Sequence, residues 1–83
     1  MYQVIIENKA RKKTRRFPKE IVKRIDNALT GLCQKPRSPG SEKLTGTDGW
    51  RIRVGDYRIL YAIDDKHKLA TVYDIDHRRE VYR

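Results

Sequence analysis

The sequence is short of cysteine, histidine and long apolar runs, and each shortage excludes a class of protein. Its 83 residues include one cysteine, Cys33, so an internal disulfide framework is impossible. One cysteine and two histidines cannot build a closed zinc site from those ligand types. No apolar stretch approaches the roughly 18 residues of a membrane span, and no signal-peptide pattern opens the chain. We therefore expect one cytoplasmic domain over residues 1–83, with no cofactor, no metal and no membrane partner.

Acidic residues are scarce as well, and the basic residues that outnumber them are unevenly placed. Twenty Lys and Arg stand against eleven Asp and Glu, which gives a net charge of +9. The stretch 9–24 contains one acid, Glu20, and these basic residues: Lys9, Arg11, Lys12, Lys13, Arg15, Arg16, Lys19, Lys23 and Arg24. Such a stretch favours a polyanion partner, because each neutralised phosphate releases counterions. The alternative is that the charge only keeps the protein soluble.

Hydrophobic patterning predicts a strand, two helices and then a meander of antiparallel strands. The strands are expected at 2–6, 50–54, 57–63 and 69–75, and the basic helix at 9–16. The second helix begins at Pro18, carries an apolar stripe that includes Ile25 and Leu29, and stops before Pro36. Residues 36–49 read as a loop. This order indicates an α+β domain with both helices on one face of a small twisted sheet.

A two-residue turn at Gly55 and Asp56 fixes the expected register of the central hairpin. Trp50, Ile52 and Val54 then share the helix-covered face with Tyr61, Ile59 and Tyr57, and we interpret the three aromatic residues as core. On the other face Arg53 stands directly opposite Arg58, and Arg51 opposite Leu60. Like charges in direct opposition destabilise a sheet pair by about 0.2–1 kcal/mol. Three arginines on one sheet face favour an anionic ligand, because guanidinium groups bind phosphate oxygens bidentately; the alternative is that they splay apart into water.

The hairpin residues 49–61, GWRIRVGDYRILY, closely resemble the central hairpin of the RelE/ParE toxin superfamily. The flanks EKLTG at 42–46 and HRREVYR at 77–83 agree, and the closing string is similar to the RelE branch. The resemblance implies a toxin of a type II toxin–antitoxin pair with a RelE-like fold. It implies a ribosome-dependent endoribonuclease that cuts mRNA in the A site by attack of the 2′-hydroxyl on the adjacent phosphate. Superfamily members of the ParE type poison DNA gyrase instead, which is the alternative function.

The resemblance also assigns roles to individual residues. Arg51 and Arg53 match paired basic positions of the family ribonucleases, and Arg58 matches the arginine that steadies the scissile phosphate. Arg78, or its neighbour Arg79, matches the late arginine near the leaving group, and Tyr82 matches the terminal tyrosine.

General acid–base chemistry adds one candidate from the residues themselves. Arginine stays protonated at neutral pH and is a poor base, whereas His77 has a suitable intrinsic pKa and is our candidate acid or base. His77 can equally be a partly exposed histidine beside Asp74 or Asp76. Tyr82 can stack on a base, orient the 2′-hydroxyl, or only pack.

The implied partners are a cognate protein antitoxin, the 70S ribosome and its mRNA. The nine basic residues of 9–24, together with Arg79, are expected to hold ribosomal RNA backbone by charge. The toxin is expected to be monomeric outside the antitoxin complex. A third reading is a catalytically inactive nucleic-acid-binding relative.

Overall fold

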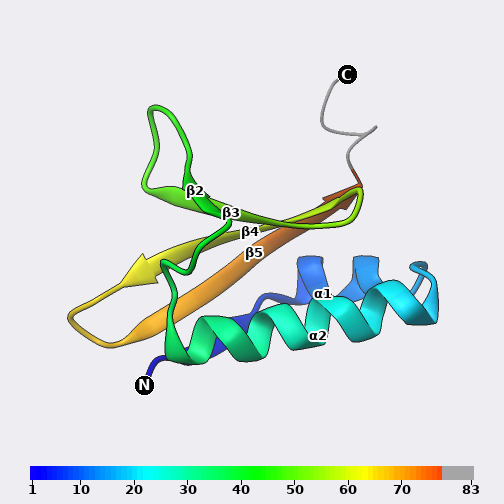
Figure 1. Cartoon of the computed structure of the whole chain (residues 1–83), viewed down its shortest axis with the longest axis horizontal. Coiled ribbons are helices and arrows are strands. Elements are labelled where there is room, and N and C mark those ends of the chain that lie inside the picture. Colours follow the sequence, from blue (N-terminus) through cyan, green and yellow to red (C-terminus); the bar gives the residue numbers. More distant parts are fainter. Residues whose placement is uncertain (78–83) are drawn as a thin grey trace.

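A computed structural model describes residues 1–77, which fold into two helices and five strands (Figure 1). The elements in chain order are β1 (Gln3–Ile6), α1 (Asn8–Thr14), α2 (Lys19–Gln34), β2 (Ser41–Lys43), β3 (Gly49–Val54), β4 (Tyr57–Asp64) and β5 (Leu69–His77). Both helices lie on one side of a single sheet, and no helix or strand of residues 1–77 covers the other side, which we call the open face (Figure 1). The predicted α+β class with helices on one face is therefore confirmed.

The strand order β1-β5-β4-β3-β2 contains two features that the sequence patterns did not predict. β1 lies beside β5 and runs parallel to it, while every other pair is antiparallel. β2 is a short edge strand inside the stretch expected to be a loop, and it pairs with β3. Its three residues, Ser-Glu-Lys, carry no apolar alternation, so only the pairing with β3 makes them a strand.

The core lies between α2 and the covered face of the sheet. Ile25, Leu29 and Leu32 form the buried stripe of α2, as their spacing predicts. They join a cluster of buried sheet residues: Val54, Ile59, Tyr61, Val72 and Ile75. The buried Tyr61 hydroxyl donates a hydrogen bond of 2.7 Å to the Pro36 carbonyl, so its polar atom is satisfied inside the core.

The central hairpin has the predicted register. Gly55 has a φ of 59°, which a glycine adopts without strain, and Val54 pairs with Tyr57 across the turn. Tyr61 is fully buried, but Trp50 and Tyr57 are half-buried. The interpretation of the three aromatic residues as core therefore holds fully for Tyr61 alone.

Helix α1 is shorter than its charge pattern predicts, and an internal acidic patch holds it. It ends at Thr14 rather than residue 16, because residues 15–17 turn back through 3₁₀-type bonds ahead of Pro18. The Lys13 ammonium lies 2.7 Å from an Asp74 oxygen and 2.5 Å from an Asp76 oxygen of β5. These two carboxylates supply the acidic partner that a helix so rich in like charge needs. Within residues 1–77, neither helix is long and apolar enough to cross a membrane.

Candidate functional site

Three arginines gather on the open face of the sheet, and we call Arg51, Arg53 and Arg58 the arginine set. Arg53 of β3 pairs directly with Arg58 of β4, and Arg51 pairs with Leu60, as expected. Their exposure differs: Arg53 is exposed, Arg51 is half-buried, and Arg58 is only 6% exposed. A residue on the open face is expected to be more exposed than Arg58 is. Arg58 lies on a central strand, with Arg53 as its register partner on one side and Asp76 on the other. Arg58 is therefore the nearly enclosed member of the arginine set.

Glu42 joins the arginine set from the edge strand β2. It pairs with Arg51 in the sheet register, and its carboxylate accepts a 2.8 Å hydrogen bond from Arg51 Nη2. That hydrogen bond lowers the pKa of Glu42 below its usual value, and the charges of Arg53 and Arg58 lower it further. All three guanidinium groups thus act on one carboxylate. The geometry places a carboxylate that is ionised at neutral pH at the arginine set.

Sequence reasoning missed Glu42 as a site residue. The one signal available was its place in the EKLTG string, the flank of the recognised hairpin. Its position beside Arg51 depends on the pairing of β2 with β3, which the composition of residues 36–49 conceals.

Two further carboxylates near the arginine set, Asp74 and Asp76, form ion pairs with lysines of α1. Asp76 is the register partner of Arg58, and Asp74 is the partner of Leu60. Both carboxylates bind Lys13, and Lys9 reaches Asp74 at 3.8 Å. Burial raises the pKa of Asp74, but hydrogen bonds to Lys13 and Asp76 outweigh it and lower the pKa overall. Lys13, one of the predicted RNA contacts, is therefore committed to an internal ion-pair network.

The structure does not bring His77 together with the arginine set. His77 pairs with Tyr57 and Arg58 pairs with Asp76, so the two pairs alternate along the strands and face opposite sides of the sheet. The His77 ring packs edge-on against Tyr57, with 4.8 Å between the ring centroids. Its role as an acid or base remains a prediction, and its ring lies on the helix side.

The remaining predicted residues lie either on α1, on α2 and in the connection between them, or beyond residue 77. Eight of the nine basic residues of 9–24 are exposed, Lys13 being the half-buried exception. Arg78, Arg79 and Tyr82 lie outside the described residues.

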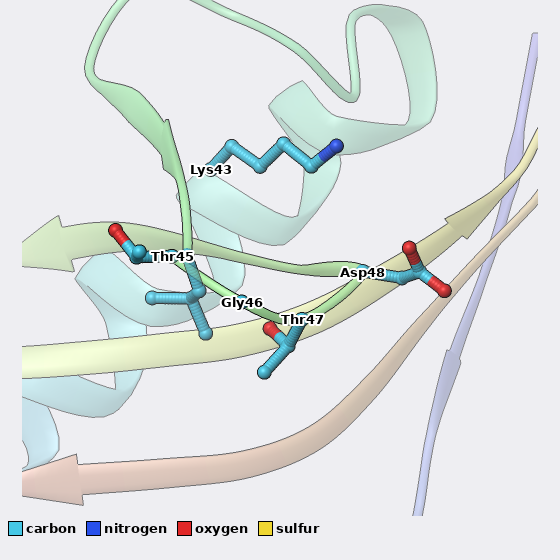
Figure 2. Close-up of a pocket in the computed structure, with 6 residues that line it drawn as sticks. Lys43, Thr45, Gly46, Thr47 and Asp48 are labelled. Carbon is cyan, nitrogen blue, oxygen red and sulfur yellow. The ribbon is translucent and has the colours of Figure 1, made fainter.

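A hollow lies at the loop between β2 and β3. Figure 2 shows its lining residues, Lys43, Leu44, Thr45, Gly46, Thr47 and Asp48. The labelled side chains extend in different directions from the loop, and no predicted site residue is among them. Within residues 1–77, no group of three or more His, Cys, Asp or Glu side chains is placed to hold a metal ion. Of the predicted catalytic residues within 1–77, the structure brings together the arginine set, with Glu42 beside it.

Such an arrangement suits a phosphodiester. Fixed guanidinium groups can surround a phosphate and stabilise the additional charge of a phosphorane. A neighbouring ionised carboxylate can accept a proton from a hydroxyl group within reach.

Comparisons with known proteins agree with this geometry. Residues 4–82 match the family model described as the ParE toxin of type II toxin–antitoxin system, parDE. Toxin RelG of Mycobacterium tuberculosis is 33% identical over 86 residues, covering 99% of this chain and 97% of that protein.

Two solved structures are similar over most of the chain. The toxin–antitoxin complex RelBE2 of M. tuberculosis has a TM-score of 0.83 and 28% identity, covering 93% of this chain and 98% of that chain. The RelE–RelB complex of Pyrococcus horikoshii has a TM-score of 0.83 and 29% identity, with 93% and 94% covered. The family match spans nearly the whole chain. The sheet that carries the arginine set belongs to the part of the chain that matches the RelE structures. The chain is therefore a RelE-like toxin, a member of the ParE toxin family within the RelE/ParE superfamily of type II toxin–antitoxin systems.

Proposed function

We propose that this toxin is a ribosome-dependent endoribonuclease that cleaves mRNA in the ribosomal A site. The 2′-hydroxyl of one nucleotide attacks the adjacent phosphate, the bond to the 5′-oxygen breaks, and a 2′,3′-cyclic phosphate and a 5′-hydroxyl end remain. The similarity to RelG and to RelE toxins supports this class of reaction.

The arginine set is the observation that carries the proposal. Arg53 and Arg58 are placed in direct opposition, an arrangement that costs stability in an isolated sheet. A phosphate bound between them removes this repulsion, and the buried Arg58 can hold the phosphate with little loss of side-chain freedom. Arg51 and Arg53 would stabilise the developing charge.

Glu42 is the general base in this proposal. None of the arginines can remove the proton from the 2′-hydroxyl at neutral pH, because each keeps its own proton. The Glu42 carboxylate is ionised, mostly exposed and 2.8 Å from Arg51. Arg78 or Arg79 and Tyr82 are proposed for the leaving-group side, where a proton must be delivered to the 5′-oxygen. His77 is not assigned to this step, because its ring lies on the helix side of the sheet.

The proposed partners of this toxin are a protein antitoxin and ribosomal RNA. The two solved relatives described above are toxin–antitoxin complexes, and we propose that a cognate protein antitoxin neutralises this toxin. The exposed cations of α1 and α2 would hold ribosomal RNA in the bacterial cytoplasm. Outside the antitoxin complex the toxin would act as a monomer.

A gyrase poison is the second candidate, because the matching family model is described by the ParE toxin. That function predicts inhibited supercoiling and DNA breaks, and it needs no cluster of arginines around a phosphate. The arginine set and Glu42 therefore favour the ribonuclease.

Primer extension on translated mRNA, after induction of the toxin without antitoxin, tests the proposal. The wild type should give codon-phased cuts with cyclic-phosphate ends, and Arg58→Ala should give none. Lys66→Ala, an exposed change of equal charge in the β4–β5 turn, is the matched control and should cut normally.

Because Arg58 is buried, its variant needs a check of folding. Circular dichroism of each variant, together with Arg53→Ala at the exposed partner position, separates loss of chemistry from loss of fold. Cutting by a folded Arg58→Ala protein, or DNA breaks without RNA cuts by the wild type, would refute the ribonuclease assignment.

A further inference from the structure

A pocket of 330 Å³ lies on the helix side of the sheet, away from the arginine set. It is lined by Lys13, Arg16, Phe17, Tyr57, Ile75 and His77, and we call it the Tyr57 pocket. The connection between α1 and α2 lies at the same end of the molecule as the β3–β4 turn and the end of β5 (Figure 1). The pocket sits where these segments meet.

Three rings form a continuous wall of this pocket. Phe17 and Tyr57 have ring centroids 4.6 Å apart at 53°, and Tyr57 and His77 have centroids 4.8 Å apart at 79°. Ile75, only 1% exposed, supplies the apolar floor. Tyr57 is half-buried, so part of its ring is available to a bound group. A planar, largely apolar ligand fits such a wall better than an extended aliphatic one.

The two cations of the Tyr57 pocket differ in what they already bind. The Lys13 ammonium is held by Asp74 and Asp76. The Arg16 side chain is exposed and has no ion pair or hydrogen bond with any residue of 1–77. Arg16 is therefore the cation that an incoming anion would meet. Among the residues that the structure describes, no carboxylate lines the pocket.

An aromatic wall with a cation beside it is the arrangement by which proteins bind single-stranded RNA. The rings stack on an unpaired base, and arginine binds its phosphate or stacks on its plane. The volume lies at the lower end of the range of about 300–1,000 Å³ that is typical of small-ligand sites. We propose that the Tyr57 pocket binds one unstacked ribonucleotide, with its base against Tyr57 and Phe17 and its phosphate at Arg16.

The surrounding charge favours RNA over an acidic peptide. Arg16 belongs to the run of nine cations over residues 9–24, eight of which are exposed and can offer further phosphate contacts. A polymer with a charge at every nucleotide uses this run fully, whereas one acidic side chain needs a single cation. The inference rests on the proposed function for its choice of RNA. The bound nucleotide is distinct from the cleaved one, since the two sites lie on opposite sides of the sheet.

Fluorescence anisotropy with a labelled, 2′-O-methylated single-stranded oligoribonucleotide tests the proposal. The probe cannot be cleaved, so binding is read even from a protein without nuclease activity, and the result is independent of the proposed reaction. Tyr57→Leu should weaken binding about tenfold, the loss expected for one stacked base. Tyr57→Phe keeps the ring and should bind as the wild type does.

Arg16→Ala and Arg15→Ala form a matched pair of charge deletions. Both residues are exposed in the α1–α2 connection, but only Arg16 lines the pocket. Arg16→Ala should weaken binding several-fold more than Arg15→Ala at the same salt concentration. Equal losses from the two variants would contradict a specific site. The Arg16 variant also keeps the test valid if Tyr57→Leu fails to fold.

Two further readouts identify the source of the nucleotide and exclude a protein ligand. Ultraviolet crosslinking of the toxin to programmed ribosomes carrying 4-thiouridine should attach a peptide containing Phe17 or Tyr57 to mRNA or to ribosomal RNA, and sequencing the crosslinked RNA names which. Absence of both crosslinks would overturn the proposal. So would a Tyr57→Leu protein that binds RNA normally but no longer binds its antitoxin, since the pocket would then belong to a protein partner.

Discussion

Arg53 of β3 and Arg58 of β4 are direct cross-strand partners on the open face of the sheet. Like charges in this position destabilise a sheet by a few tenths of a kcal/mol or more, in a small domain whose total stability is of the order of 5–15 kcal/mol. An anion bound between the two guanidinium groups would turn this repulsion into a binding contribution. Loss of the exposed Arg53 should therefore raise stability and lower activity.

Replacing Arg53 with Thr should raise the free energy of unfolding by up to about 1 kcal/mol and reduce mRNA cutting. The change removes the repulsion with Arg58 and places a good strand former at an exposed position. Urea denaturation measures the first effect and primer extension the second. Arg51→Thr is the control, because it breaks the ion pair with Glu42 and should not stabilise the protein. Full activity of Arg53→Thr would argue against a phosphate at this pair.

Glu42→Gln should lower the rate of mRNA cleavage by about 10²–10⁴-fold, the usual contribution of a general base, with the fold unchanged. Because Arg51, Arg53 and Arg58 lower the pKa of Glu42, the carboxylate should stay ionised throughout pH 6–8. Loss of the base through its protonation is thus expected only below the ordinary carboxyl pKa of 4.5. Single-turnover cleavage on programmed ribosomes measures this, with Lys43→Ala of the same strand as control. A Glu42→Gln protein as fast as the wild type would exclude the base role.

Asp65→Asn should destabilise the protein at neutral pH but not near pH 2. Hydrogen bonds from Arg37 and Tyr2 lower the pKa of Asp65 from 3.8 to about 2. A lowered pKa in the folded state stabilises the fold above the unfolded pKa, and this stabilisation is lost as the pH falls through the folded value. The melting temperatures of wild type and variant should therefore converge between about pH 4 and pH 2. A difference that does not change with pH would contradict the assignment.

Lys12→Ala and Lys13→Ala should separate an RNA contact from a structural cation. Lys12 is exposed, so its loss should reduce the slope of log affinity for ribosomal RNA against log salt by about 1 and leave stability unchanged. Lys13→Ala leaves Asp74 and Asp76 with much less positive charge beside them, and it should lower the melting temperature. Filter binding over a salt series and thermal melting distinguish the two. Equal effects on stability would show that Lys13 is not structural.

The parts of the fold that depend on nearby residues could be predicted from the sequence. The apolar spacing of Ile25 and Leu29 indicated α2, and the two-residue turn at Gly55 fixed the pairing of Arg53 with Arg58. In both cases the information lies within a few residues of the feature it determines.

The parts that depend on distant pairing could not be predicted. Glu42 reaches Arg51 only because β2 joins the sheet, and a three-residue polar strand has no periodicity to reveal it. His77 was placed with the arginines because it follows the last strand. Its actual face is set by the register of β4 with β5, which contains an irregularity between Leu60 and Tyr61.

The parallel pairing of β1 with β5 links the first strand of residues 1–77 to the last one there. Gln3 is opposite Leu69, so the edge made by β1 cannot form while β5 is still inside the exit tunnel of the translating ribosome. The nascent chain must wait with β1 unpaired, and the five-stranded sheet assembles only once β5 has emerged. Completion of the sheet therefore follows the synthesis of β5.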